Sequence, residues 1–384
     1  MRKRIYPITL ILLLILAMGI LFGVQREVSV SEKRELMTSE EIRIEELSQD
    51  TDEVLKDQFV FRDGISRLYY RIRIFFSRLF GSSWVRDAKI TALTDEVSEL
   101  EDGYLLNAPL FYSEEDLKAA ASRGYNVREF AERYPELSVY VYFPTRLEEL
   151  LSSAYGYLPE CQNSFIAQLP SNVKHDSLKL ESAEDYKKYY YRTDSHWNAY
   201  GAYQGYQDII AMIRKDFELS EVRQIKEEVS FPYEFYGNIT SKIARLSDAE
   251  QLVNLKLEGE KPFDYYVNHE AAEYEKSRRE YAEKGNSTAF SDYDLYFGDN
   301  SFLREFDFHQ NERPNLLIFG DSYVNTNMEW IASHFNRTVI VDLRAKDASF
   351  DLDALIKEKE IDAVLVMFYY NNMYFNGNEY IPLP

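Results

Sequence analysis

The chain has 384 residues, of which 45% are hydrophobic, and carries a formal net charge of −21 at pH 7. This length can bury the core of one large or two smaller domains. Nucleic acid is excluded as an expected partner, because binding phosphates requires a basic surface. Cys161 is the single cysteine, which excludes an intramolecular disulfide and leaves no Cys–His zinc spacing. The sequence therefore predicts a globular protein without a metal or another cofactor.

The N-terminal segment predicts a membrane anchor. Arg2, Lys3 and Arg4 precede residues 5–24, which are almost wholly apolar and long enough to cross a bilayer. The basic residues place the N-terminus in the cytoplasm and the remainder of the chain outside. Residues 1–24 are thus expected to form a cytoplasmic tip and a transmembrane signal anchor of a single-pass protein in the cell membrane. A cleaved signal peptide is the alternative, but the apolar run is long for one.

Residues 25–85 read as a spacer with an amphipathic helical segment. Within 57–80, apolar side chains recur at helical spacing, and several arginines lie between them. A helix on a membrane surface is one interpretation. Packing of the apolar side against the rest of the protein, with the arginines in solvent, is the favoured one. The apolar positions are Ile65, Leu68, Tyr69, Ile72 and Phe76.

Residues 86–384 predict one α/β domain, within which 218–290 is a candidate insertion or small subdomain without recognisable chemistry. A strand at 138–143 and helices at 146–154 and 199–217 are expected first. The last part alternates regularly, which predicts a parallel sheet with helices on both faces. Its expected elements are strand 316–319, helix 325–334, strand 339–341, helix 351–359 and strand 363–368.

A turn after the apolar strand 316–319 holds the first candidate catalytic residue. Gly320, Asp321 and Ser322 break the apolar pattern, and a helical pattern follows. A serine between a strand and a helix is exposed at the carboxyl end of the strand, as in a nucleophile elbow. The alternative is that Asp321 or Ser322 only caps the helix.

Asp194 and His196 are the candidate orienting carboxylate and general base that a nucleophilic serine requires. Their spacing of two lets a carboxylate hold an imidazole in one tautomer while the other ring nitrogen faces the serine. We therefore expect the Ser322 hydroxyl within about 2.6–3.2 Å of one His196 nitrogen, and Asp194 at the other. A metal site that uses Asp194, His196 and one more histidine is the weaker alternative. The remaining histidines, expected on the surface, are His175, His269, His309 and His334.

These two stretches together resemble the DHHW proteins, which are similar to the alginate O-acetylation proteins of the SGNH-hydrolase-like superfamily. The chain departs from the family name at one position, where Ser195 replaces the first histidine. The resemblance implies an SGNH-hydrolase-like fold in permuted order, with Asp194 and His196 ahead of Ser322. The residues that carry it are Asp194-Ser195-His196-Trp197, Gly201-Ala202 and Asp321-Ser322-Tyr323, with Ser31–Arg34, Asp57–Phe59, Arg62-Asp63, Asp102–Leu105, Phe143–Thr145 and Phe297–Asn300.

By this resemblance the expected activity is extracytoplasmic, serine-dependent transfer of an acyl group, most simply acetyl, on a cell-surface or exported polysaccharide, or hydrolysis of acetyl esters there. A membrane-embedded O-acyltransferase is the implied partner that passes on the acyl donor. Backbone N–H groups of Ser322 or Tyr323 are candidate oxyanion donors, and the resemblance adds Gly298 and Asn300. The alternative is a non-catalytic carbohydrate-binding or assembly module. Tyr369, Tyr370, Tyr374 and Phe375 could pack in the protein or form a platform for sugar rings.

Overall fold

The computed structural model describes residues 28–29, 34–36, 57, 62–86, 88–108, 112–152, 159–285, 292–298, 301–345 and 350–369. The predicted anchor, residues 1–24, lies outside the described residues. Among the residues that are described, no helix combines the length and the apolar character that crossing a membrane requires.

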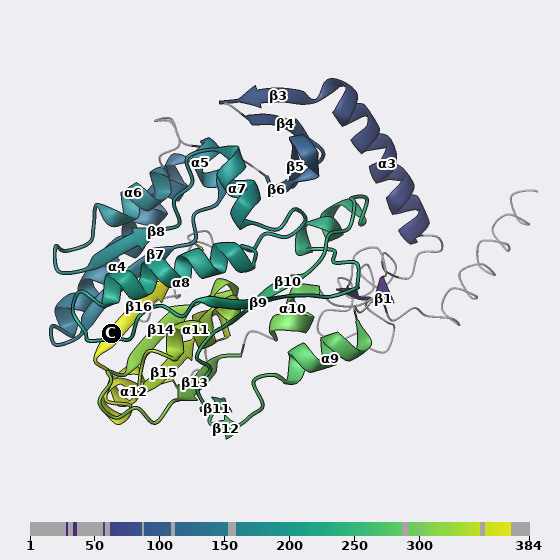
Figure 1. Cartoon of the computed structure of the whole chain (residues 1–384). Coiled ribbons are helices and arrows are strands. Elements are labelled where there is room, and N and C mark those ends of the chain that lie inside the picture. The colour runs from purple at the N-terminus through teal and green to yellow at the C-terminus, as the bar shows by residue number, and fades with distance from the viewer. Residues whose placement is uncertain are drawn as a thin grey trace, which may run out of the picture.

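An eight-stranded sheet forms the centre of the protein (Figure 1). Its strands follow the order β12-β11-β13-β15-β14-β16-β7-β8. The prediction of a parallel sheet is correct for β15 to β8 and wrong for the other three strands, so the sheet is mixed. The strands are β7 (Ser138–Phe143), β8 (Lys174–Ser177), β11 (Asp264–Val267), β12 (Glu270–Ala271), β13 (Leu303–Asp307), β14 (Leu316–Gly320), β15 (Arg337–Val341) and β16 (Ala363–Met367).

The β11–β12 hairpin at the antiparallel edge has a local cause. Asn268 and His269 join β11 to β12, and both have positive φ, at 48° and 69°. Two successive residues of this kind form the type of tight turn that folds a chain back as a hairpin. β11 then pairs antiparallel with β13, and β13 with β15.

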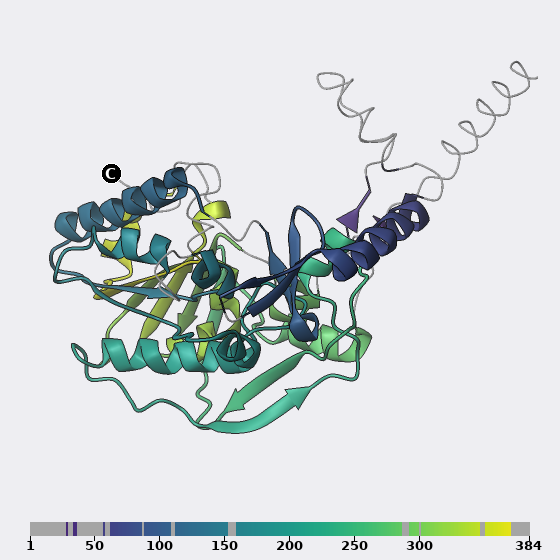
Figure 2. The ribbon, with the colours of Figure 1, turned by 90° about the horizontal axis from the view of Figure 1, so that it is seen from above.

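Helices cover both faces of the sheet, as the alternation of strands and helices predicts. Successive residues of β14 point to opposite sides, so Leu317 and Phe319 belong to one apolar core, and Leu316 and Ile318 to the other. Figure 2 shows α4 and α8 on opposite sides of the sheet. The first core contains side chains of α4 (Glu114–Arg133), α6 (Glu160–Ile166) and α12 (Leu352–Glu358), and the second those of α8 (Ala199–Ile213) and α11 (Met328–Ala332).

A second, antiparallel sheet of four strands lies beside the first, next to α3 (Figure 1). It contains β3 (Ser82–Val85), β4 (Ala88–Ala92), β5 (Val97–Leu100) and β6 (Leu105–Asn107), and α3 spans Arg62–Phe80. The remaining elements are β1 (Val28–Ser29), β2 (Arg34–Glu35), η4 (Glu101–Gly103), α5 (Leu147–Ser152), α7 (Ala183–Tyr189), β9 (Ile225–Ser230), η5 (Asn238–Ile243), β10 (Val253–Leu257), α9 (Lys276–Lys284), α10 (Asp292–Phe297), η6 (Ser322–Thr326) and η7 (Leu343–Ala345).

The favoured interpretation of the 57–80 segment is wrong in one respect. The helix forms, but the apolar residues expected to pack against the protein face outward, with Ile72 52% and Leu68 59% exposed. The buried side of α3 is the opposite one, where Ile74 joins a small apolar cluster. The sequence pattern identifies two sides of the helix, but not which of them the protein covers.

His334 also differs from its expected place on the surface. It is 1% exposed, and its ring lies between the Tyr206 hydroxyl at 2.7 Å and the Ser220 hydroxyl at 2.8 Å. Burial, reinforced by the nearby Lys261 and Arg223 charges, lowers the pKa of His334 to about 3. The ring is therefore neutral in the folded protein at pH 5–8.

This burial predicts a specific loss of stability in acid. The unfolded chain takes up a proton near the ordinary histidine pKa of about 6.5, whereas the folded protein does so only near 3. The unfolded state thus binds more protons between these values, so stability falls as the pH drops from about 6.5 towards 3. Denaturant unfolding from pH 7 to pH 4 should show a shallower pH slope for His334→Gln, which keeps polar groups but cannot titrate. Identical slopes would contradict a buried neutral His334.

Candidate active site

Ser322 follows the central strand β14 through a tight turn. A Cβ atom at Gly320 would lie 2.3 Å from a side-chain carbon of Val324, so the close approach of this turn to η6 requires glycine. Asp321 then caps η6, and its Oδ1 accepts from the Tyr323 N–H at 3.0 Å. Both interpretations of this turn are realised, because Asp321 forms the cap and leaves the Ser322 side chain to face another element.

The segment with Asp194 and His196 is a short turn closed at both ends. Tyr190 and Trp197 form an antiparallel bridge across it. Asn198 caps α8 directly afterwards, with its side-chain oxygen accepting from two backbone N–H groups. The buried Trp197 indole donates to the Tyr323 carbonyl at 3.1 Å. This bond joins the turn to the segment that carries Ser322.

The structure brings the three predicted residues together in one hydrogen-bonded series. Ser322 Oγ lies 2.7 Å from His196 Nε2, although the two residues are 126 positions apart. His196 Nδ1 lies 2.6 Å from Asp194 Oδ1. Ser322 and His196 are each 7% exposed and Asp194 is fully buried. The serine is therefore more enclosed than the exposed turn that its sequence suggests.

Asp194 is held as an ionised carboxylate. Burial alone raises its pKa, but the His196 charge and several hydrogen bonds outweigh burial and hold the pKa below its ordinary value. The bonds come from the His196 ring, the His196 backbone N–H at 2.9 Å and the Asn238 backbone N–H at 2.7 Å. When the imidazole is neutral, an ionised acceptor at Nδ1 places the single ring proton there, which leaves Nε2 unprotonated towards Ser322.

The segment 218–290, in which the sequence indicates no chemistry, supports this turn directly. Gly237 passes so close to Asp194 that a Cβ atom would lie 2.4 Å from its Cα and Cβ. The Asn238 side chain bonds both the N–H and the hydroxyl of Ser195. Glu250 accepts from the N–H groups of Arg192 and Thr193 at 2.9 and 2.7 Å. These residues escape sequence reasoning because they act mainly on backbone groups, which leave no pattern of side chains.

Tyr293 of α10 is a second neighbour that the sequence did not indicate. Its ring stacks on His196, with the centroids 3.9 Å apart and the planes 8° from parallel. Its hydroxyl donates to the Ser322 carbonyl at 3.0 Å and lies 2.8 Å from the Thr326 hydroxyl. Tyr293 thus fixes the plane of the imidazole and the backbone of the serine turn together.

Two of the predicted oxyanion donors form hydrogen bonds within the protein. The Gly298 N–H donates to the Asp294 carbonyl at 2.8 Å and so closes the end of α10. The Tyr323 N–H donates to Asp321, as described above. Asn300 lies outside the described residues. Among the predicted donors that the structure describes, the N–H of Ser322 remains a candidate, and the prediction for Asn300 stays untested.

The predicted sugar platform is represented here by Tyr369, which is 6% exposed and packed inside the protein. Its N–H donates to Asp321 Oδ2 at 2.9 Å, and the Arg146 guanidinium lies 4.5 Å from its ring centre. Its other predicted members, Tyr370, Tyr374 and Phe375, lie outside the described residues. Across the described part of the chain, no group of three or more acidic, histidine or cysteine side chains could hold a metal ion.

Comparisons with known proteins support the resemblance found in the sequence. Residues 174–280 match the family model for the SGNH hydrolase-like domain of the acetyltransferase AlgX. This span contains Asp194, His196 and Asn238, while Ser322 lies beyond it. A comparison with curated protein sequences gave no match.

Two solved structures share the fold. PatB1 from Bacillus cereus with a sulfonyl adduct has 19% identity and a TM-score of 0.56, covering 72% of this chain and 97% of that one. A DHHW family protein from Eubacterium siraeum DSM 15702 has 20% identity and a TM-score of 0.54, covering 73% and 92%. The chain is therefore an α/β protein similar in fold to a DHHW protein, and its residues 174–280 resemble an SGNH hydrolase-like domain.

The close approach of Gly237 to Asp194 yields a testable prediction. Gly237→Ala should lower the free energy of unfolding by about 1–3 kcal/mol, because the new methyl group would have to displace backbone atoms. Denaturant unfolding measures this loss. Gly64→Ala is the matched control, since a Cβ atom there meets nothing within 4 Å. Equal free energies of unfolding for the two variants would contradict the prediction, because they would show that the backbone at Gly237 can move to accommodate a methyl group.

Proposed function

We propose that this protein transfers an O-acyl group, most simply acetyl, to or from a polysaccharide, with Ser322 as the nucleophile. The observation that carries the proposal is the hydrogen-bonded series from Ser322 through His196 to Asp194. Such a series activates a hydroxyl that is otherwise a weak nucleophile. The carboxyl ends of β14 and β16 lie at the same edge of the sheet, where α/β proteins usually hold their reacting groups.

The reaction proceeds in two halves. Ser322 Oγ attacks the acyl carbonyl carbon while His196 Nε2 takes the hydroxyl proton, and the carbonyl electron pair moves onto its oxygen. The tetrahedral species then expels the donor's oxygen, which receives the proton from His196, and leaves an acyl ester on Ser322. In the second half, His196 deprotonates a sugar hydroxyl or a water, whose oxygen attacks the ester carbonyl carbon. The bond to Ser322 Oγ then breaks, and His196 returns the proton to Oγ. Transfer and hydrolysis thus differ only in the acceptor.

Two further groups support these steps. The Ser322 N–H, at the start of η6, is the donor we assign to the oxyanion, since the Tyr323 and Gly298 amides donate elsewhere. Tyr293 holds the imidazole plane through stacking while its hydroxyl holds the serine backbone. Neither group exchanges a proton with the substrate, so both act by position and dipole.

The substrate class is inferred from the relatives, and the location from the apolar run at residues 5–24 behind three basic residues. The family model that matches residues 174–280 names an acetyltransferase, AlgX. PatB1 has been solved with a sulfonyl adduct, which is consistent with a reactive nucleophile on this fold. We infer a polysaccharide acceptor outside the cell membrane and a membrane-embedded O-acyltransferase that supplies the acyl group. The permuted order of the site, with Asp194 and His196 before Ser322, belongs to the same proposal.

Ester cleavage tests the catalytic claim. Ser322→Ala and His196→Ala should each lower cleavage of a chromogenic acetyl ester by a factor on the order of 10⁴ or more, because triad members act as one unit. The double variant should lose little more than either single variant. Asp194→Asn should lower the rate by about 10⁴-fold, because an amide favours the wrong tautomer of His196.

Ser83→Ala is the control, since this serine is exposed on β3, away from the three residues. A phenylmethylsulfonyl probe should label the native protein and the Ser83→Ala variant but not Ser322→Ala, as intact-mass spectrometry would report. Native rates of ester cleavage in Ser322→Ala would overturn the mechanism. That result would instead favour a non-catalytic carbohydrate-binding or assembly module.

The proposed anchor has its own test. The apolar run at residues 5–24 behind Arg2, Lys3 and Arg4 should keep the full chain in the membrane fraction. Protease added to intact spheroplasts should digest the domain, whereas a cytoplasmic marker protein survives. Recovery of the full-length chain in the cytosolic fraction would contradict the anchor.

A further inference from the structure

The outer face of α3 is an apolar surface that no described part of the protein covers. We define it by Ile65, Leu68, Ile72, Phe76 and Phe80, of which the least exposed, Ile72, is still 52% exposed. Their spacing of three, four and seven residues places them along one side of the helix. In Figures 1 and 2, α3 lies at the end of the molecule opposite to α4 and α12. A helix side of this size in contact with water is an unusual arrangement for a protein that acts alone.

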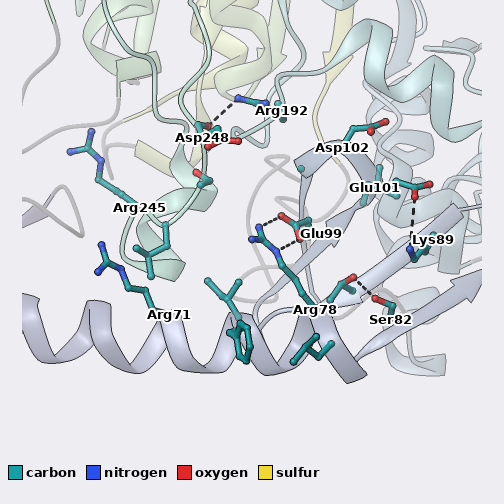
Figure 3. A pocket seen from close by; sticks show the side chains of 18 of the residues that line it. Arg71, Arg78, Ser82, Lys89, Glu99, Glu101, Asp102, Arg192, Arg245 and Asp248 are labelled. Atoms are coloured by element: carbon teal, nitrogen blue, oxygen red, sulfur yellow. Dashed lines mark hydrogen bonds and ion pairs between the residues drawn. The ribbon is translucent and has the colours of Figure 1, made fainter.

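The arginines of α3 lie mainly on the side that faces the protein. Arg78 pairs with Glu99 at 2.6 Å and Arg73 with Asp95 at 2.8 Å. Arg67 and Arg71 line a cavity of about 1100 Å³ between α3 and the four-stranded sheet. Figure 3 shows Arg71 and Arg78 extending from α3 on the cavity side. Arg67, Arg71 and Arg78 therefore lie on the side of α3 that is turned away from the apolar outer face.

The charge of the helix points to an anionic surface. The sequence of α3 contains five arginines and one aspartate, a net charge of +4 (5 − 1), in a chain whose net charge is −21. Basic segments next to a bilayer are attracted to its anionic lipids. A second copy of this chain fits the outer face poorly, since symmetric pairing would bring two arginine-rich helices together.

The position of α3 in the chain points to the bilayer as well. The apolar run ends at Val24 and α3 begins at Arg62, so residues 25–61 are 37 residues (61 − 25 + 1). Even fully extended, this segment reaches no more than about 130 Å. A run inserted in the bilayer would thus keep α3 at a high effective concentration at the same surface.

We propose that α3 lies on the bilayer that holds the anchor, with its apolar outer face in the interfacial region and its net positive charge attracted to anionic lipids. The proposal rests on the proposed anchor and adds a second, peripheral contact. Aromatic residues within the stripe, such as Phe76 and Phe80, suit this depth of the membrane. The bilayer then covers the apolar surface that the rest of the protein leaves open.

Spin-label accessibility tests this contact in the full-length chain. Cys161→Ala removes the single native thiol, and Ile72→Cys or Phe76→Cys then takes a nitroxide label. The protein is reconstituted in vesicles that contain phosphatidylglycerol. Oxygen, which concentrates in the bilayer, should relax the label strongly, whereas a water-soluble nickel chelate should lose access to it. The matched control is Tyr125→Cys, an exposed aromatic position on α4, which should stay open to the nickel chelate.

Each outcome is decisive. Strong oxygen and weak nickel access at positions 72 and 76, with the reverse at 125, supports the proposal. Strong nickel access at 72 and 76 shows that the outer face is in water and overturns it. Exclusion of both reagents shows that protein covers the face, and also overturns the proposal.

Flotation of the vesicles reports separately on the anchor, and a chain that fails to float would overturn the anchor and this contact together. Ester cleavage by the same samples reports independently on the catalytic proposal.

Discussion

The ionised Asp194 carboxylate is the constraint on which the arrangement of this site depends. A buried charge costs free energy unless it is paired and hydrogen-bonded. Here one oxygen accepts from the ring and backbone of His196, and the other accepts from the Asn238 N–H. Removal of any of these donors would favour the neutral acid, which could no longer fix the tautomer of His196. The reactivity proposed for Ser322 thus begins with how the backbone of another segment solvates a carboxylate.

The fold meets this constraint by making several distant segments converge. The strand β14 delivers Ser322 at its carboxyl end, and the N-terminal end of α8 holds the Asp194–His196 turn in place. The Trp197 indole and the Tyr293 hydroxyl then connect the two turns by hydrogen bonds to the carbonyls of Tyr323 and Ser322. Both acceptors are backbone groups. The position of Ser322 relative to His196 is therefore set by main-chain atoms and not by flexible side chains. A short distance between the hydroxyl and the imidazole follows from this rigidity.

The sequence predicted those features that depend on residues close together in the chain. The strands 138–143, 316–319 and 363–368 are apolar runs bounded by turn residues, and the structure confirms them as β7, β14 and β16. Asp194 and His196 form a motif within three residues, so their proximity needed no knowledge of the fold. Gly237 and Asn238 act through main-chain contacts with a turn 43 or 44 positions earlier, which no pattern of side chains announces. The mixed sheet was missed for the same reason, since the direction of a strand depends on its partner.

A single short element connects the proposed chemistry to the proposed membrane contact. The 3-10 helix η5 begins at Asn238, whose N–H binds Asp194, and its Ile239 and Ile243 pack in one apolar cluster with Ile74 of α3. The element η5 therefore contacts the Asp194 carboxylate through Asn238 and the buried side of α3 through Ile239 and Ile243. Through this packing, η5 fixes the orientation of α3 relative to Asp194. No second conformation is required, because the packed core is rigid. If lipid holds α3, the same cluster fixes how far from the bilayer, and in which direction, an acyl group must arrive to meet Ser322.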